Sequence, residues 1–271
     1  MANSDGAPYT WLNVPRWYLW DGGFLLLGRA TGVVPAHAHH AIQIVISLDT
    51  PVAIRGPRED WRHARGLIVQ PDVEHAFNCN GALGAMIFVD PESTEGAWLR
   101  AALPHPISLV PDSRLAPAAA ALQMFVDDPI AALSPAALIR HCVHSLTPGA
   151  PPLHRLDPRV TAVLARIHSS GDLRISLAAA ASMACLSPSR FAHLFKDQVG
   201  LPYSRFLLWR KLTRAMLAIG SSRTIADAAH AADFADAAHL TRTSYQMVGM
   251  APSVLMRGSF AEIPSPSQPE S

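Results

Sequence analysis

The chain has 271 residues, 49% of them apolar, and a formal net charge of +1. This length favours two domains, and the sequence has no run of about 18 apolar residues that would form a membrane-spanning helix. The first fifteen residues also lack the basic start and apolar stretch of a signal peptide, so we expect a cytoplasmic protein without membrane partners.

The charge is distributed unevenly along the chain. Residues 1–153 carry 9 Arg and 13 acidic residues, a balance of −4, whereas residues 154–260 carry 13 basic and 6 acidic residues, a balance of +7. Such an asymmetry is typical of a nucleic-acid-binding domain fused to a domain with another role, although a solvated Arg-rich helix face gives the same count.

The N-terminal part has the pattern of a β-rich domain followed by helices. Short apolar or β-branched runs predict five strands, which cover residues 24–27, 42–48, 52–55, 67–70 and 83–89. Their close spacing favours a barrel or sandwich over a parallel α/β sheet. Residues 115–126 and 135–146 are Ala-rich and predict two apolar helices, which need a partner surface and therefore suggest a dimer. We assign residues 1–146 to one domain that includes these helices.

Two histidine-containing segments lie within this β-rich part. The first contains Gly32, His37, His39 and Gln43, and the second contains Gly66, Pro71, His75 and Asn78. His37 and His39 point to the same face of one strand, and His75 can approach from a neighbouring strand.

The pair of segments resembles the two half-motifs of the cupin barrel, which implies a cupin-like sensor domain. Three imidazoles and an amide oxygen, from His37, His39, His75 and Gln43, would suit a divalent Fe, Mn, Ni or Zn ion. The metal site is the alternative to the interpretation that we favour, a barrel without metal that binds an organic small-molecule effector. His40 and His63 are further candidates for the lining of the barrel.

Other reactive groups give weaker signals. Cys79, Cys142 and Cys185 have no disulfide or zinc-site spacing, although Cys79 near His75 could form a thiol sensor. His141 and His144 flank Cys142 on an expected helix and could form a metal or redox site, or simply an interface.

Most enzyme classes are excluded because their motifs are missing. The sequence has no Gly-x-Ser-x-Gly elbow, P-loop or dinucleotide-binding glycine fingerprint. A metal-dependent cupin enzyme, or a metal or redox sensor that uses the same histidines, is the alternative for which the residues are present. We expect a protein that is not an enzyme.

The C-terminal part is predicted to be helical. Residues 147–157 contain three prolines and a glycine and are expected to form a linker, residues 158–257 a helical domain, and residues 258–271 a disordered tail. Within the helical domain, residues 177–188 and 225–236 each predict a short helix, a tight turn and the start of a second helix. Ser187 before Pro188, and Thr224 with Asp227, are the expected N-terminal caps.

Further residues in this part match a known family in order and spacing. They are residues 187–200 (SPSRFAHLFKDQVG), then Arg210, Leu212 and Ala215, then residues 225–234, and finally Gly249, Pro252 and Ser253. This region of about 100 residues resembles the DNA-binding domain of AraC-type transcription regulators, which often carry a cupin-like barrel in front of it. Asp233 stands where the family usually has Gly, and Ser244 where an aromatic residue usually packs, so the second unit is expected to be looser.

The resemblance implies two helix-turn-helix units that place recognition helices in successive major-groove segments of double-stranded DNA. Helical spacing turns Phe191, Leu194 and Phe195 inward in the first unit, and Phe234 and Leu240 inward in the second. The candidate DNA-binding residues are Ser187, Ser189, Arg190, His193, Lys196, Ala237, Ala238, Thr241, Arg242 and Tyr245. Because alanines begin the second recognition helix, we expect it to specify less sequence than the first.

A connecting helix over about residues 203–219 has its core stripe at Leu208, Leu212, Ala215 and Ile219, and its Arg and Lys side chains could reach phosphates or acidic neighbours. The sequence therefore predicts an α+β protein of two domains, a cupin-like β-barrel with following helices and an all-α domain with two helix-turn-helix units. We expect a ligand-responsive transcription regulator that is an activator rather than a repressor. Its expected partners are double-stranded DNA, a small-molecule effector, a second copy of the chain and, for an activator, RNA polymerase.

Overall fold

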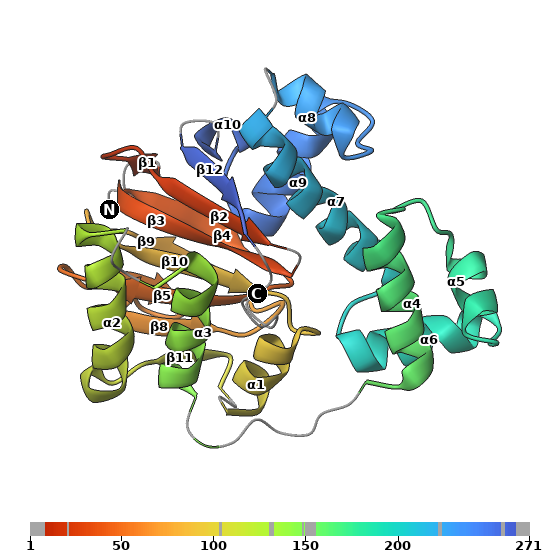
Figure 1. The fold of residues 1–271 in the computed structure, drawn as a ribbon, viewed down its shortest axis with the longest axis horizontal. Helices are drawn as coiled ribbons and strands as arrows, with labels where there is room; N and C mark the ends of the chain where they lie inside the picture. Colours follow the sequence, from red (N-terminus) through yellow and green to blue (C-terminus); the bar gives the residue numbers. More distant parts are fainter. Residues whose placement is uncertain are drawn as a thin grey trace.

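The computed structural model describes residues 9–20, 22–102, 105–129, 133–147, 149, 156–221, 224–255 and 258–263. Its N-terminal part contains two β-sheets (Figure 1). The larger sheet has the order β11-β8-β5-β10-β3-β2-β12, with β1 paired to β3, and the smaller has the order β4-β9-β6-β7. The strands are β1 (Thr10–Trp11), β2 (Arg16–Trp20), β3 (Gly23–Thr31), β4 (Val33–His37), β5 (Ile42–Ser47), β6 (Val52–Arg55), β7 (Arg62–Ala64), β8 (Gly66–Val69), β9 (His75–Asn78), β10 (Leu83–Val89), β11 (Ile107–Leu109) and β12 (Ser259–Glu262).

The five expected strands are present as β3, β5, β6, β8 and β10. The expected barrel is not closed, because no ladder of hydrogen bonds joins the two sheets among the described strands. β4 carries a register irregularity between Val34 and His37 where it pairs with β9. Such an interruption bends a strand and ends regular pairing, and the result is two facing sheets.

Alternation along the strands gives the larger sheet two buried faces. In β3, Phe24 and Leu26 point towards the smaller sheet, whereas Leu25 and Leu27 point towards helices on the opposite face. Those helices are α1 (Thr94–Ala102), α2 (Asp112–Asp127) and α3 (Pro135–Leu146), which lie across the sheet in Figure 1. The apolar faces of α2 and α3, from which we predicted a dimer, are thus covered within the chain, and the dimer stays a prediction.

The C-terminal part is helical, as expected. It consists of α4 (Pro158–Ser170), α5 (Leu177–Met183), α6 (Pro188–Val199), α7 (Tyr203–Ser221), α8 (Ile225–Ala231), α9 (Ala237–Val248) and α10 (Pro252–Leu255). Ser187 caps α6, with Pro188 in its first turn, and Thr224 and Asp227 form a capping box on α8. We call α5 and α6 the first helix pair, and α8 and α9 the second helix pair.

The prediction of a disordered tail is wrong for residues 258–263. β12 pairs in parallel with β2, and the ring of Phe260 stacks on that of Trp17 with centroids 5.8 Å apart. Composition pointed to disorder, but an exposed edge of β2 and an aromatic partner were available. The segment that follows the helical domain therefore adds a strand to the larger sheet. Most of the predicted linker, and residues 264–271, lie outside the described residues.

The two helix pairs belong to different hydrophobic cores. The first shares a core with α4 and the start of α7, which includes Phe191, Phe195 and Phe206. The second shares a core with both β-sheets and the rest of α7, which includes Trp209 and Leu240. Figure 1 shows α7 running from the group of α4–α6 to the group of α8–α10 beside the sheets. The boundary between the two cores falls within α7, between Phe206 and Trp209.

Candidate nucleic-acid interface and histidine site

The first helix pair presents a polar face at α6. The predicted residues Ser187, Ser189, Arg190, His193 and Lys196 are all exposed, because Phe191 and Phe195 hold the opposite face of α6 in the core. Leu194, predicted to point inward, is half-buried. The exposed face begins at the capped N-terminus of α6, where side chains of a recognition helix contact base edges.

The second helix pair presents a smaller face of the same kind at α9. Ala238, Arg242 and Tyr245 are exposed, whereas Ala237 and Thr241 are half-buried. Phe234 and Leu240 are buried, as expected. Asp236 caps α9 through a hydrogen bond from the His239 amide. Packing on the sheets therefore leaves the predicted outward face of α9 open.

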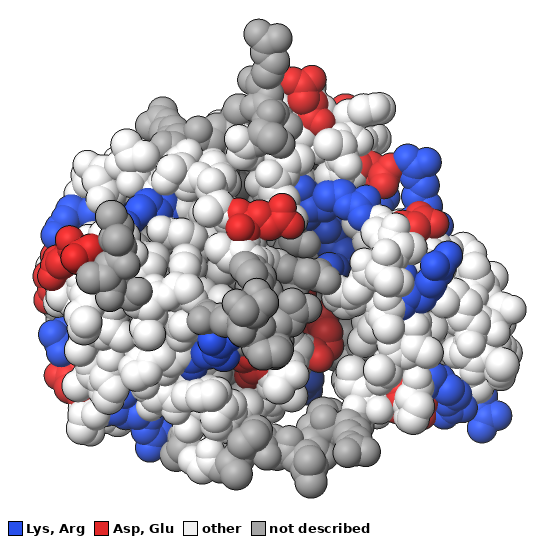
Figure 2. Space-filling view, in the orientation of Figure 1, with Lys and Arg blue, Asp and Glu red and all other residues white. Residues whose placement is uncertain are grey.

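Basic side chains are spread over the helical part of the molecule. In the view of Figure 2, Lys and Arg lie over this part together with acidic side chains. Of the basic residues on α7, Arg210 and Arg214 contact Asp90 and Asp233. Of the two alternatives that the sequence left open, phosphates or acidic neighbours, these two arginines contact acidic neighbours.

Three predicted histidines meet in one buried cluster. His37 at the end of β4, His39 after it and His75 on β9 can each supply one ligand atom, and these atoms lie within 4.8 Å of one another. Gln43 on β5 completes the cluster, with Oε1 lying 3.0 Å from Nε2 of both His39 and His75. The three histidines are 7%, 1% and 1% exposed. The structure thus brings together all four residues expected at this site, which we call the histidine cluster.

Main-chain carbonyls fix the protonation of all three rings. Nδ1 of His37 lies 2.8 Å from Pro35 O, Nδ1 of His39 lies 2.7 Å from Ala41 O, and Nδ1 of His75 lies 2.9 Å from Val73 O. A carbonyl only accepts hydrogen bonds, so each Nδ1 carries the proton and each neutral ring has its lone pair on Nε2.

The surroundings keep these rings uncharged. Burial and the neighbouring imidazoles lower the pKa of His37 to about 4 and that of His75 to about 2, and burial lowers the pKa of His39. Lone pairs held in place by hydrogen bonds from the opposite ring nitrogen are how proteins orient histidine ligands of a metal.

The C-terminal end of α9 lies directly against this cluster. Gly249 ends α9 with a φ of +69°, and a Cβ atom at this position would lie 2.8 Å from His37 Nδ1. Side chains disfavour positive φ, and here they would also meet the imidazole. The second helix pair and the histidine cluster are therefore in contact.

A buried polar junction joins α7 to the strands, and it was missed in the sequence. Asp90, just after β10, accepts hydrogen bonds from Trp209 Nε1 at 2.8 Å and from Arg210 at 3.1 Å. His40 contributes to the same junction, where its Nε2 lies 3.0 Å from Glu92 Oε2. Residues 120 positions apart in sequence give no pattern that could have predicted these contacts.

Other predicted candidates do not converge. His40 turns away from the histidine cluster to the α7 junction, and His63 is exposed on β7. His141 lies near Pro117 O, whereas His144 packs on Trp98, so the group around Cys142 forms no joint site. Cys79 is buried, and burial raises the pKa of its thiol, which makes it a poor nucleophile.

An apolar cavity lies between the sheets. Its lining includes Trp11, Val45, Phe77, Cys79 and Met86. Met86 also lies next to Gln43, whose Nε2 is 3.6 Å from its sulfur. The side chain of Met86 therefore lies between this cavity and the histidine cluster.

Comparisons with known proteins agree with this architecture. Residues 180–258 match a family described as a helix-turn-helix domain. The crystal structure of ToxT from Vibrio cholerae O395 is similar over 81% of this chain and 90% of its own, with 8% identity and a TM-score of 0.54. A second ToxT structure from Vibrio cholerae, at 1.65 Å resolution, is similar over 87% of this chain and 99% of its own, with 8% identity and a TM-score of 0.55.

Another similarity covers about a third of the chain. A transcriptional regulator from Chromobacterium violaceum, described as an AraC-type DNA-binding domain-containing protein, matches 36% of this chain and 89% of its own, with 20% identity and a TM-score of 0.34. No curated protein is significantly similar in sequence. Residues 180–258 of the chain are thus a helix-turn-helix domain. In the part of the chain that is described, no helix has the length and apolar character needed to span a bilayer.

Proposed function

We propose that this protein is a transcription regulator that binds double-stranded DNA through both helix pairs. The observation that carries the proposal is the exposed polar face of α6, which starts at a capped N-terminus within an AraC-type helix-turn-helix domain. Arg190 can donate two hydrogen bonds to a guanine edge, and His193 can donate to a base or phosphate. α9 adds a second, less polar face through Arg242 and Tyr245.

DNA binding can be tested without knowing the operator. Sequences bound by the purified protein are selected from random double-stranded DNA, and the affinity for the selected sequence is measured by fluorescence anisotropy. If the protein neutralises about 6–10 phosphates, its affinity for DNA should fall by about 10³–10⁵-fold as the salt concentration rises from about 50 to about 200 mM. Affinity that is independent of salt, or equal for a scrambled sequence, would contradict the proposal.

We further propose that the histidine cluster binds a divalent metal ion as the signal to which the regulator responds. The three Nε2 lone pairs and the Gln43 oxygen lie close together, and a divalent cation could accept electron pairs from all four. Imidazole ligands suit Zn, Fe, Mn or Ni. The near-complete burial of the cluster favours sensing over catalysis, because a substrate would have little access to the ion.

Metal content of protein purified without a tag or chelator tests this second proposal. We expect about one ion per chain, lost in His37→Ala and in His75→Ala, with His63→Ala as a matched control on the exposed strand β7. Protein that holds no metal, and takes up none when Zn²⁺, Mn²⁺, Fe²⁺ or Ni²⁺ is supplied, would favour an organic effector in the apolar cavity.

The way in which the signal reaches DNA is part of the same proposal. A ligand in the histidine cluster lies against Gly249, at the end of the proposed second recognition helix. Occupancy therefore changes the packing of α9 on the sheets and shifts the population that is competent to bind DNA. Activation through RNA polymerase is proposed from the family resemblance alone, and dimer formation from the Ala-rich helices predicted at residues 115–126 and 135–146.

A further inference from the structure

Separate cores leave open what sets the angle between the two helix pairs. Tyr203 and Phe206 on α7 pack with the first pair, and Trp209 and Leu212 pack with the second pair and the sheets. Apolar packing thus holds each pair to its own part of α7. A continuous helix can still bend or twist between two such anchors.

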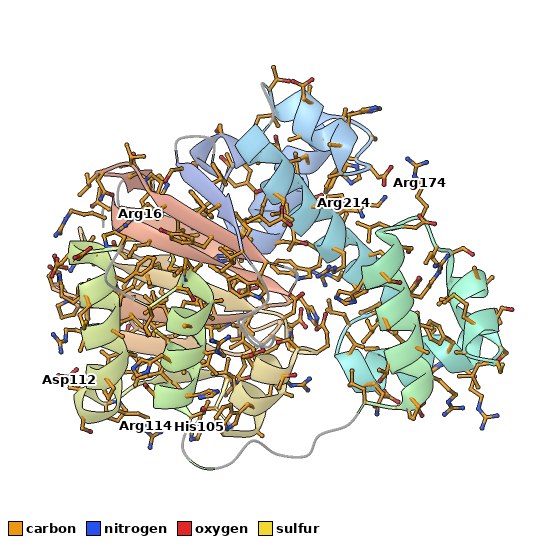
Figure 3. All side chains as sticks on the ribbon, in the orientation of Figure 1. Arg16, His105, Asp112, Arg114, Arg174 and Arg214 are labelled. Atoms are coloured by element: carbon orange, nitrogen blue, oxygen red, sulfur yellow. The ribbon has the colours of Figure 1, made fainter. Side chains whose placement is uncertain are left out.

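Polar contacts bridge the two pairs at one residue. Arg174, in the connection between α4 and α5, donates from Nε to Asp233 Oδ1 at 2.9 Å, and a second guanidinium nitrogen contacts the same oxygen. Asp233 lies in the turn of the second pair. In Figure 3 the side chain of Arg174 rises from the first pair's side towards that turn.

α7 contributes to the same contact from the middle of its length. Arg214 lies 3.5 Å from Asp233 Oδ2 and also donates to the Gly171 carbonyl at the end of α4. Lys211 donates to the main-chain oxygen of Asp233 at 3.1 Å. One carboxylate thus joins the first pair's side, α7 and the second pair, and the hydrogen bonds from Arg174 lower the pKa of Asp233 so that it is ionised at neutral pH.

The backbone of Asp233 adopts the left-handed conformation. Its φ is +60°, a conformation in which glycine is favoured. Cys185 occupies the corresponding place in the turn of the first pair, with a φ of +53°. The turns of the two pairs thus share this backbone conformation, and the turn of the second pair carries a carboxylate. The looser second unit expected from the missing glycine stays a prediction.

We propose that Asp233 is a positioning residue that clasps the two helix pairs through Arg174 and Arg214, and so sets the spacing of the two DNA segments that α6 and α9 read. This inference rests on the proposed function for the DNA segments, but the clasp itself exists without DNA. The side chain of Arg174 is largely exposed, so this ion pair contributes little to the overall stability of the protein. We expect it to act on the relative orientation of the two helix pairs.

The first experiment measures orientation without DNA. Spin labels on the exposed Cys185 and on Gln246→Cys of α9 report the distance between the pairs, while the buried Cys79 and Cys142 stay unlabelled. We expect Asp233→Gly and Arg174→Ala to broaden the distance distribution, and Arg166→Ala, which removes an exposed charge from α4, to leave it unchanged. An unchanged distribution in both clasp variants would overturn the proposal.

The second experiment measures spacing on DNA. For the selected two-segment sequence, each clasp variant is expected to lose about twofold to fivefold in affinity, with no loss on DNA that carries only the segment read by α6. The double variant should lose no more than either single variant. Equal losses of Arg174→Ala on both DNAs, with a gain for Asp233→Gly, would instead mark Arg174 as a phosphate contact. If no DNA is bound, the spin-label result still decides the clasp.

Discussion

The two helix pairs share a local construction but differ in what they pack on. Both have a short first helix, a turn with a residue at positive φ, and a capped second helix with a Gly at its C-terminus. The first pair packs on α4 and the start of α7, and the second packs on the sheets beside the histidine cluster. In the proposed function, the first pair reads DNA independently of the sheets, and the second pair responds to the β-sheet part.

The largest expected effect is the separate loss of the first core. Phe195→Ala removes a ring that contacts Phe191, Tyr203 and Phe206, and should cost about 3–5 kcal/mol. All six Trp residues lie in the sheet part or at position 209, so tryptophan fluorescence should keep its denaturation midpoint while circular dichroism gains an earlier transition. A shift of both signals together would show that the two cores unfold as one.

The matched change in the second pair should behave differently. Leu240→Ala on α9 opens a cavity in the core shared with the sheets and should cost about 2–5 kcal/mol. Because that core contains Trp17 and Trp209, the fluorescence midpoint is expected to fall with it. A fluorescence midpoint equal to that of the wild type would contradict the shared core.

Base reading should also differ between the pairs. Arg190→Ala is expected to cost about 1–3 kcal/mol in binding to the selected DNA and to relax specificity at one position. Arg242→Ala on α9 should cost less, because the alanines beside it offer no hydrogen bonds to bases. Anisotropy with the selected and single-base-changed DNAs measures both. The ranking of the pairs would be wrong if Arg242→Ala had the larger effect on specificity.

A smaller effect tests the contact between α9 and the histidine cluster. Gly200 and Gly249 end α6 and α9 with positive φ, but a Cβ would meet His37 only at position 249. In each variant the strained φ should cost about 1–2 kcal/mol. Gly249→Ala adds a clash, because its Cβ would lie 2.4 Å from Val34 Cγ1, whereas a Cβ at Gly200 has nothing within 4 Å. Only Gly249→Ala should also weaken metal binding, as measured by competition with a chromogenic chelator. Equal metal affinity in the two variants would break the proposed link.

Local patterns were sufficient for much of the fold. The caps at Ser187 and Thr224, the core positions of α6 and the five strands follow from side chains within a few residues of one another. The histidine cluster was predicted because alternation along strands and a motif spacing are local features too. β12 and the open arrangement of the sheets were not predicted, because they depend on which surfaces meet in space.

The contacts between parts of the molecule were beyond the sequence for the same reason. Asp90 and Trp209 are 119 positions apart, and Arg174 and Asp233 are 59 apart. Asp233 was noticed in the sequence, because an Asp stands there where the resembled family usually has a Gly. The sequence could not supply the partner, because no periodicity relates one turn to another across α7.

The most direct test of this account is hydrogen exchange of metal-free protein with and without added Zn²⁺. The account predicts slower exchange in β4, in β9 and in residues 241–250 at the end of α9, with no change in residues 188–199 of α6. Protection confined to the strands, or equal protection of α6 and α9, would contradict the claim that the histidine cluster is linked to the second helix pair and not to the first.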